Sequence, residues 1–374
     1  MHRLRCAGYL TVRIGRSKVN AGFETRASPP NSSSFLLSST RFSNSAAFRL
    51  TIQKSRFFGP LRRALIPADD GLVHSLEHER SSRMSSKAVP DIVVRTAVPE
   101  DAAVCGQICY DAFFAISSSH GFPCDFPAPE AAIGALSAMF SSPSCYCVVA
   151  EIDGRIVGSN CLVEGSPICG VGPITIQPGT QNRGVGRRLM EVAMDRAVGR
   201  GAAGVRLVQA AFHNRSFSLY TSLGFDVREP LACLQGTTRE RSVPGCEVRL
   251  ATAADEEGCN ALSRQVHGFA RVVELAQAVA HGNARVVERG GRITGYTSHL
   301  GFFGHTTAET NVDLQALIAS ADSLAGPGIL VPSRNSVLLR WCMENGLRVV
   351  QPMTLMSTGL YNEPAGAWLP SVIF

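Results

Sequence analysis

One stretch of this chain decides its fold: Gln181-Asn182-Arg183-Gly184-Val185-Gly186-Arg187-Arg188-Leu189-Met190. It follows an apolar run at residues 171–176 and opens a segment whose apolar residues recur at helical spacing. A strand, a glycine turn and a helix start form an anion site, because the first amides of a helix lack partners and carry the positive end of its dipole. The glycines let the backbone approach a phosphate, and the arginines add positive charge. We therefore predict a pyrophosphate-binding loop, which we call the phosphate loop (residues 181–187).

Known phosphate-binding motifs narrow the identity of this loop. The dinucleotide-binding fingerprint requires a third glycine where Leu189 stands. The loop of nucleoside triphosphatases requires Gly-Lys-Ser/Thr after four intervening residues, and no such run follows. The pattern that matches is Gln/Arg-x-x-Gly-x-Gly/Ala, three residues after a proline that ends a strand, and Pro178, Gln181, Gly184 and Gly186 occupy its positions. In this loop pattern the chain resembles the GNAT superfamily of CoA-dependent N-acyltransferases.

The segments around the phosphate loop predict one domain over residues 91–235. The expected strands are residues 91–95, 145–151, 155–161, 171–176, 205–209 and 225–228. Helices are expected after Pro99, over 129–140, after the phosphate loop and over 215–223. The helix after Pro99 is expected to bury Val104, Ile108 and Ala112. This order is that of the GNAT fold, an α/β fold with a central mixed sheet flanked by helices.

A second motif supports the resemblance. Residues 216–225, Ser-Phe-Ser-Leu-Tyr-Thr-Ser-Leu-Gly-Phe, resemble that superfamily's Leu-Tyr-x-x-x-Gly-Phe signature. The resemblance implies that acetyl-CoA lies where two parallel strands splay apart, with its pantetheine arm against the backbone around Ile174 and Ile176. It also implies that the amides of the phosphate loop hold the pyrophosphate, through Gln181, Asn182, Arg183, Gly184, Val185, Gly186 and Arg187. Metal ligands are not expected.

The resemblance also assigns the proton donor. Tyr220 would stand near the thioester sulfur, and a tyrosine with a pKa of about 10 can protonate a departing thiolate. The alternative is a half-buried aromatic that packs the helix. The family often has Asn seven residues before this Tyr. Here His213 holds that place and Asn214 follows it, so Asn214 is the candidate for the polar contact to the cofactor. His213 is then a solvated residue or a general base.

The family has no fixed residue that removes the proton from the amine. Glu164, at the end of an expected strand, is the nearest acidic candidate, although we expect a solvated carboxylate there. The loop at residues 117–129 carries Phe122 and Phe126 and either shapes the mouth of a substrate site or folds over the core.

Length and charge exclude several classes of protein. The 374 residues suggest about two domains. No uncharged apolar run reaches the roughly 18 residues of a membrane span, so no membrane partner is expected. Residues 1–83 hold 14 Lys and Arg against 5 Asp and Glu, a net charge of +9, whereas the remaining residues carry −3. A basic nucleic-acid-binding face is therefore not expected.

The cysteines indicate reduced thiols. No Cys-x-x-Cys and no paired Cys/His spacing for zinc occurs among the 12 cysteines. Cys105 and Cys109 are four apart on an expected helix, and Cys145 and Cys147 share one face of an expected strand. Both pairs are expected to fill small apolar spaces, which fits a reducing compartment.

Residues 1–83 do not read as a domain. They are rich in Ser and Arg and poor in acid, and such a segment cannot bury enough apolar surface to offset the entropy of ordering. We expect a disordered leader, either an organellar transit peptide or sequence upstream of a true start at Met84. The second interpretation, which we favour slightly, gives a cytoplasmic protein. The first gives a mitochondrial or plastid protein.

The C-terminal part repeats the first. Residues 248–259 are similar to residues 94–105, residues 284–295 to 147–158, and residues 338–349 to 216–227. We therefore expect two tandem GNAT-like domains, the second over residues 246–361, followed by a tail at 362–374 that docks on a domain surface.

The second copy lacks the phosphate-loop pattern between Gly304 and Gly328, and Cys342 stands where Tyr220 stands in the first. Asn335 lies seven residues before Cys342. We expect this degenerate copy not to turn over acyl-CoA but to pack against the first and help form the acceptor pocket.

Three functions follow. The first is transfer of an acetyl or short acyl group to a small-molecule or peptide amine. The second is a non-catalytic acyl-CoA-binding regulatory module, and the third is a scaffold. The intact phosphate loop favours the first.

Overall fold

The computed structural model describes residues 10–14, 17–21 and 91–373. Residues 1–83 and 84–374 are separate units. Within the leader that we expect to be disordered, β1 (Leu10–Ile14) and β2 (Ser17–Ala21) pair as antiparallel strands. The rest of that expectation lies outside the described residues. Among the described helices, none has the length and apolarity that a membrane crossing requires.

The first half of the folded unit follows the predicted order of elements, with two differences. The apolar run before the phosphate loop is broken into two short strands, and the last strand is longer than predicted. The elements are β3 (Val93–Thr96), the 3₁₀ turn η1 (Pro99–Asp101), α2 (Ala102–Ser119), α3 (Pro129–Phe140), β4 (Cys145–Ile152), β5 (Arg155–Val163), β6 (Ile168–Val171), β7 (Thr175–Ile176), α4 (Val185–Gly199), β8 (Gly204–Ala210), α5 (Asn214–Ser222) and β9 (Asp226–Gln235).

The second half repeats this order, except that one strand replaces the two short strands before the third helix and a further strand follows at the end. This confirms the expected tandem α/β fold. Its elements are β10 (Glu247–Leu250), η2 (Ala253–Asp255), α6 (Glu256–His267), α7 (Val272–Ala280), β11 (Arg285–Arg289), β12 (Arg292–Thr297), β13 (Thr306–Ala308), α8 (Asn311–Ala319), β14 (Ile329–Pro332), α9 (Ser336–Glu344), β15 (Arg348–Gly359) and β16 (Ala367–Leu369). An ion pair is repeated too. Arg95 contacts Asp101 at 2.7 Å, and Arg249 contacts Asp255 at 2.7 Å.

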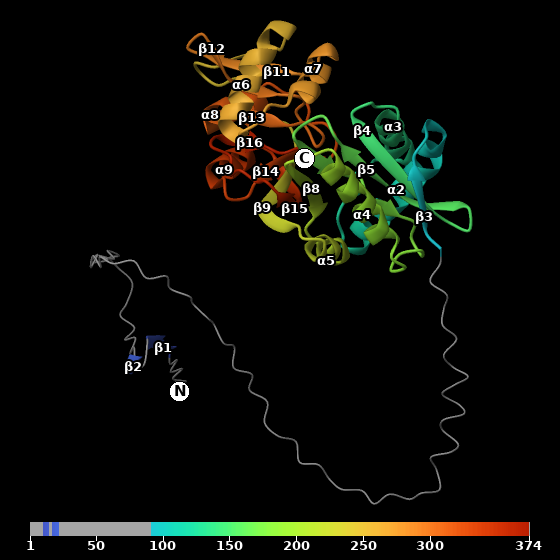
Figure 1. Ribbon diagram of the computed structural model, residues 1–374. Coiled ribbons are helices and arrows are strands. Elements are labelled where there is room, and N and C mark those ends of the chain that lie inside the picture. Colours follow the sequence, from blue (N-terminus) through green and yellow to red (C-terminus); the bar gives the residue numbers. More distant parts are fainter. Residues whose placement is uncertain (1–9, 15–16, 22–90, 374) are drawn as a thin grey trace, which may run out of the picture. The chain divides into compact units, whose positions relative to one another are not determined.

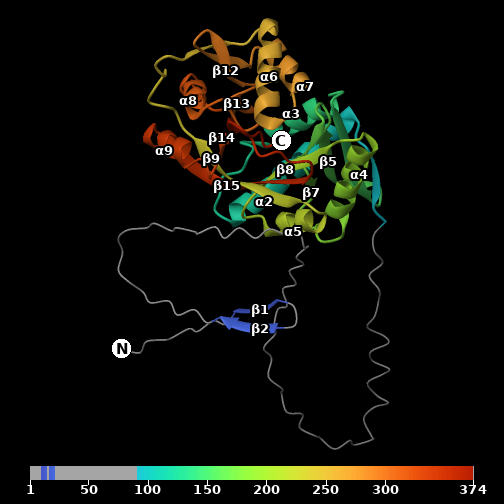
Figure 2. The same ribbon diagram turned by 60° about the vertical axis from the view of Figure 1, so that its left-hand side comes forward.

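The two halves exchange strands through a shared sheet. One sheet has nine strands, ordered β14-β9-β15-β8-β6-β5-β4-β3 with β7 paired to β5, and the other has the order β10-β11-β12-β13-β16. Strand β15 of the second half thus lies between β8 and β9 of the first. Reciprocally, β9 lies between β14 and β15. Figure 1 and Figure 2 show these four strands at the junction of the halves.

The first long helix packs only in part as predicted. Ile108, Cys105 and Cys109 are buried as expected, whereas Val104, also expected to be buried, is 49% exposed. The reason is that α2 lies very close to α3. A Cβ on Gly106 would stand 2.5 Å from Cα of Ile133, so the face with small side chains turns inward. The described cysteines are free thiols, as predicted.

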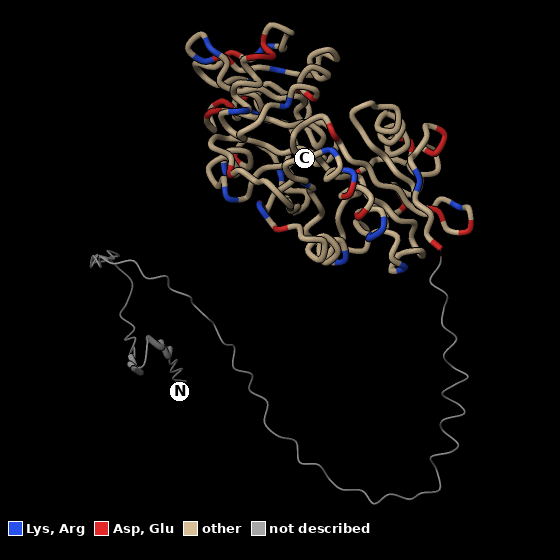
Figure 3. The backbone as a smooth tube through the Cα atoms, in the orientation of Figure 1, with Lys and Arg blue, Asp and Glu red and all other residues tan. Residues whose placement is uncertain are grey.

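Helix α4 buries the predicted side. Leu189, Ala193 and Ala197 are buried against the sheet, and Arg183, Arg187 and Arg188 are exposed. Across the described fold, basic and acidic residues are interspersed in the view of Figure 3, in keeping with the small net charge of this part of the chain.

Candidate active site

A cavity of about 300 Å³ lies beside β8 where this strand loses its parallel neighbour. The pairing of β6 with β8 ends at Gly170 and Arg206, after which β7 pairs with β5 instead. Residues 173–176 line one side of the resulting opening, and residues 207–210 line the other. Unpaired backbone groups of two diverging strands can therefore face a ligand.

The phosphate loop has the backbone of an anion site. Gly184 is the N-cap of α4 with a φ of 90°, and Asn182 has a φ of 65°. Both residues are exposed, as is Arg183. Residues 185–187 form the first turn of α4, where backbone amides have no carbonyl of their own helix to bond.

Gly186 has a packing role that the sequence did not indicate. A Cβ at this position would stand 3.2 Å from Cδ1 of Ile176 and 3.5 Å from Cδ2 of Leu219. The glycine therefore lets α4 approach β7 and α5 closely. The Val185 side chain is likewise buried in the core, so only its backbone can serve a ligand.

Side chains connect the phosphate loop to α5. The Gln181 amide donates to the carbonyl of Ile176 at 3.3 Å and accepts from Arg215. Arg187 donates to Oγ of Ser222 at 2.7 Å. These contacts orient two arginines along one edge of the loop, where they favour a negatively charged ligand.

Some predicted site residues reach the cavity and others do not. Its lining includes Ile174, Ile176, Gln181 and Tyr220. Asn214 is exposed and lies outside the lining. The remaining loop residues also lie outside the lining, namely Asn182, Arg183, Gly184, Val185, Gly186 and Arg187.

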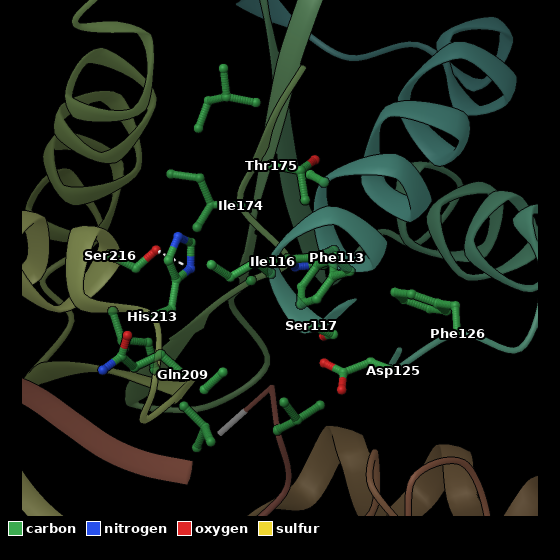
Figure 4. A pocket seen from close by; sticks show the side chains of 18 of the residues that line it. Phe113, Ile116, Ser117, Asp125, Phe126, Ile174, Thr175, Gln209, His213 and Ser216 are labelled. Atoms are coloured by element: carbon green, nitrogen blue, oxygen red, sulfur yellow. Dashed lines mark hydrogen bonds between the residues drawn. The ribbon is translucent and has the colours of Figure 1, made fainter. Parts of the chain in front are cut away.

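Tyr220 lies at the inner end of a short polar chain. Its ring is buried, and burial raises its pKa to about 12, against the smaller opposing effect of a hydrogen bond with Ser216. The hydroxyl of Ser216 lies 2.8 Å from Nδ1 of His213 (Figure 4). Burial also lowers the pKa of His213 to about 4, so the imidazole is neutral at pH 7.

His213 therefore differs from the solvated residue that we expected. It is half-buried and lines the cavity beside Ser216. Glu164 also differs from expectation. It is only 6% exposed and pairs with Arg196 at 2.7 Å and Arg200 at 2.6 Å. It lies outside the lining of the cavity and is a structural ion-pair partner rather than a solvated carboxylate.

Asp125 is the site residue that the sequence did not reveal. It belongs to the loop after α2 and lines the cavity together with Phe126. Burial raises the pKa of its carboxyl to about 6, opposed by a hydrogen bond from Gln351. That bond, from Nε2 of Gln351 to Oδ1, is 2.8 Å long and comes from β15 of the second half. The loop's aromatic residues gave the only hint of this role.

Gln209 is a second polar residue that we missed. Its side chain is 6% exposed, and neither its amide nitrogen nor its amide oxygen has a hydrogen-bond partner among the described residues. It comes from β8 and borders the cavity (Figure 4). A buried amide without partners is costly, so this one is available to hydrogen-bond a polar group of a ligand.

The second half closes one wall of the cavity. Phe302, Phe303 and Met353 contribute side chains, as do Val372 and Ile373 of the C-terminal tail. The tail is held in place because β16 pairs with β13. The apolar wall thus comes from segments that lie far from the phosphate loop in sequence.

The helix start that corresponds to the phosphate loop in the second half is closed by a carboxylate. By its place in the order of elements, α8 corresponds to α4. Asp313 in its first turn is fully buried and accepts from the amide of Thr310 at 3.1 Å and from Oγ1 of Thr294 at 2.6 Å. Arg289 pairs with the same carboxylate at 3.1 Å. An internal anion therefore sits where an external one would bind.

The two further residues noted in the second copy have structural roles. Cys342 is fully buried in the hydrophobic core. Asn335 caps α9, because its side-chain oxygen accepts from the amide of Leu338 at 3.2 Å.

Comparison with known proteins identifies a similar sequence family and similar folds. A model of the acetyltransferase (GNAT) family matches residues 111–225. Among solved structures, a putative acetyltransferase from Pyrococcus horikoshii is 18% identical with a TM-score of 0.56, and the match covers 74% of this chain and 94% of that one.

Two other solved structures are similar over comparable lengths. A GCN5-related N-acetyltransferase from Sphaerobacter thermophilus is 14% identical with a TM-score of 0.49, covering 73% of this chain and 96% of that one. A tandem GNAT protein from the clavulanic acid biosynthesis pathway is 15% identical with a TM-score of 0.46, covering 75% and 100%. No curated protein matches this sequence significantly.

Proposed function

We propose that this chain, which belongs to the acetyltransferase (GNAT) family through residues 111–225, transfers an acetyl group from acetyl-CoA to an amine. The observation that supports this most is the exposed phosphate loop, with Gly184 at a φ of 90°, beside a cavity that contains the buried Tyr220. Acetyl-CoA supplies the activated acyl group as a thioester. The family match supports acyl transfer in general, and the assignment of an amine as the acceptor is our additional proposal.

The residues present fit acetyl-CoA. The first turn of α4, Asn182 and Arg183 would hold its pyrophosphate, because helix-start amides and an exposed guanidinium favour an anion. The backbone around Ile174 and Ile176 would lie along the pantetheine arm. The unpaired amide of Gln209 suits a ligand that itself carries amide groups.

Tyr220 would hold the proton that the leaving sulfur requires. A raised pKa keeps the phenol protonated throughout the physiological range, so the proton is available when charge develops on sulfur. Ser216 and His213 continue the polar chain, and the neutral imidazole can relay a proton to the phenolate through the serine hydroxyl if its other ring nitrogen takes one up from solvent.

We expect the second half not to bind a second acetyl-CoA. The carboxylate of Asp313, paired with Arg289, already occupies the helix start that would receive the phosphates. Its contribution to the reaction is then the wall formed by Phe302, Phe303 and Met353.

The test is an acceptor panel with acetyl-CoA, in which free thiol is detected as CoA is released. Acceptor-dependent thiol release supports the proposal, and a blank without acceptor corrects for hydrolysis. Binding of acetyl-CoA in calorimetry without thiol release for any amine would instead favour a non-catalytic regulatory module.

A further inference from the structure

Building on the proposed function, we propose that the acceptor is a small apolar monoamine and that Asp125 binds its ammonium group. Asp125 and the apolar wall of the second half would then select the substrate together.

The first argument is the charge inside the cavity. Of the residues that line it, only Asp125 and Arg215 carry a formal charge at pH 7, because the pKa of His213 is low. Arg215 is bonded to Gln181 at the edge of the phosphate loop. The rest of the cavity therefore holds one negative charge and no positive one.

The second argument is that no cation among residues 91–373 pairs with Asp125. Its side-chain hydrogen-bond partner there is the neutral amide of Gln351, and the carboxylate points into the cavity (Figure 4). Asp125 is half-buried, and a carboxylate that loses part of its water is costly unless an opposite charge compensates it. A bound ammonium group supplies that charge and donates hydrogen bonds to the free oxygen. The nitrogen loses one proton before it attacks the thioester carbonyl, and the Asp125 carboxylate that it contacts accepts this proton, while the sulfur leaves as the thiol with the proton of Tyr220.

The third argument is the apolar surroundings of this carboxylate. Phe113 and Phe126 meet edge to face with ring centres 5.8 Å apart, and both line the cavity. Met139, Phe302 and Phe303 add further apolar surface. Such walls favour a hydrocarbon or aromatic body on the amine.

The same features exclude two other classes of amine. An amino acid would bring its own carboxylate close to Asp125, where like charges disfavour each other. A polyamine would bury further ammonium groups for which the lining offers no second carboxylate.

Gln351 is the positioning residue in this arrangement. It is 1% exposed, and through its bond to Oδ1 it fixes the direction of the carboxylate. Because it belongs to β15, acceptor choice by the first half depends on the second.

The experiment compares 2-phenylethylamine, phenylalanine and spermidine as acceptors for the full chain. We expect kcat/KM to be at least tenfold higher for 2-phenylethylamine than for either of the others. Asp125→Asn should raise the KM for 2-phenylethylamine at least tenfold while leaving the affinity for acetyl-CoA unchanged. Asp111→Asn is the matched control, because Asp111 is exposed on α2 and its side chain accepts a hydrogen bond from Gln107 on the same helix. It should change neither quantity.

Calorimetric titration of 2-phenylethylamine into the CoA-saturated protein separates this inference from the proposed function. Binding that Asp125→Asn weakens at least tenfold supports the inference even if no acetyl group is transferred. Preferred turnover of phenylalanine or spermidine, or an unchanged KM and unchanged binding in Asp125→Asn, would overturn the inference while leaving acetyl transfer intact.

Discussion

Leu207 of β8 lies opposite Met356 of β15 in the antiparallel register of the shared sheet. Its counterpart in the repeat is the pair Leu234 and Ile329, which face each other between β9 and β14. Leu207 lies 122 positions before its equivalent, Ile329, and Leu234 lies 122 positions before its equivalent, Met356. The exchange of strands is therefore reciprocal, and each half completes the sheet of the other.

We predict that the two halves unfold together. Leu207→Ala removes a buried side chain and should lower the free energy of unfolding by about 2–5 kcal/mol. The two tryptophans, Trp341 and Trp368, lie in the second half, so their fluorescence reports a half that does not carry the mutation. Denaturant transitions followed by fluorescence and by circular dichroism should shift equally.

The control for this experiment is Val198→Ala, because Val198 is 75% exposed and the change should stay within about 0.5 kcal/mol. A fluorescence transition that stays in place while the circular dichroism transition shifts would show that the halves unfold independently.

The strand exchange explains what the sequence could and could not predict. Helical spacing at Leu189 and the motif around Tyr220 are local signals, so they indicated α4, α5 and their order. Strand pairing depends on partners far apart in the chain, and the repeat of residues 216–227 at 338–349 does not say which copy pairs with which. Asp125 could not be predicted for the same reason, because its role depends on Gln351, which lies 226 positions away in the chain.

A change in the phosphate loop tests its role in binding. Gly184→Asp should abolish acetyl-CoA binding in calorimetry, because it places a negative side chain at the helix start. Gly201→Asp is a matched control. Gly201 also has a positive φ, 70° against 90°, and open space around it, so the backbone strain is similar. Affinity that Gly201→Asp lowers as much as Gly184→Asp would remove the phosphate loop from the binding site.

Tyr220→Phe tests the proton donor. It should lower kcat at least about a hundredfold, the lower range for general acid catalysis, with little change in the affinity for acetyl-CoA. Tyr110→Phe is the control, since Tyr110 stacks on Phe114 of α2 and lies outside the cavity lining. Equal rates for Tyr220→Phe and the unaltered protein would leave Tyr220 with a packing role only.

The charge of Asp125 predicts an acid limb in the pH profile of kcat/KM, that is, a fall in kcat/KM at low pH. With a pKa of about 6, the carboxylate is lost as the pH falls below 6, and kcat/KM for 2-phenylethylamine should then fall about tenfold per pH unit. The titratable groups that face it are the thiols of Cys109, Cys124 and Cys233, whose pKa values are raised, so they stay neutral there. The limb should vanish in Asp125→Asn, and its persistence would assign it to another group.

A buried pair of histidines predicts how stability depends on pH. Nε2 of His267 and Nε2 of His305 lie 3.2 Å apart in the second half, and both side chains are 1% exposed. Burial, with the nearby charges of Arg206 and Arg271, lowers both pKa values well below 6.5. The unfolded chain therefore binds protons below pH 6.5 that the folded chain does not, and stability falls as the pH is lowered through that value.

For two such groups the slope approaches about 2.7 kcal/mol per pH unit below pH 6. Asp125 acts in the opposite direction between its unfolded pKa and about 6, because its folded pKa is raised. The contribution of Asp125 is the same in the unaltered protein and in the histidine variants, so it cancels when their slopes are compared. His305→Gln should flatten the slope of the free energy of unfolding between pH 6.5 and 5 by about 1.4 kcal/mol per pH unit, measured by urea denaturation. His281→Gln, at an exposed position, should leave it unchanged. Equal slopes for all three proteins would mean that His305 is protonated in the folded state.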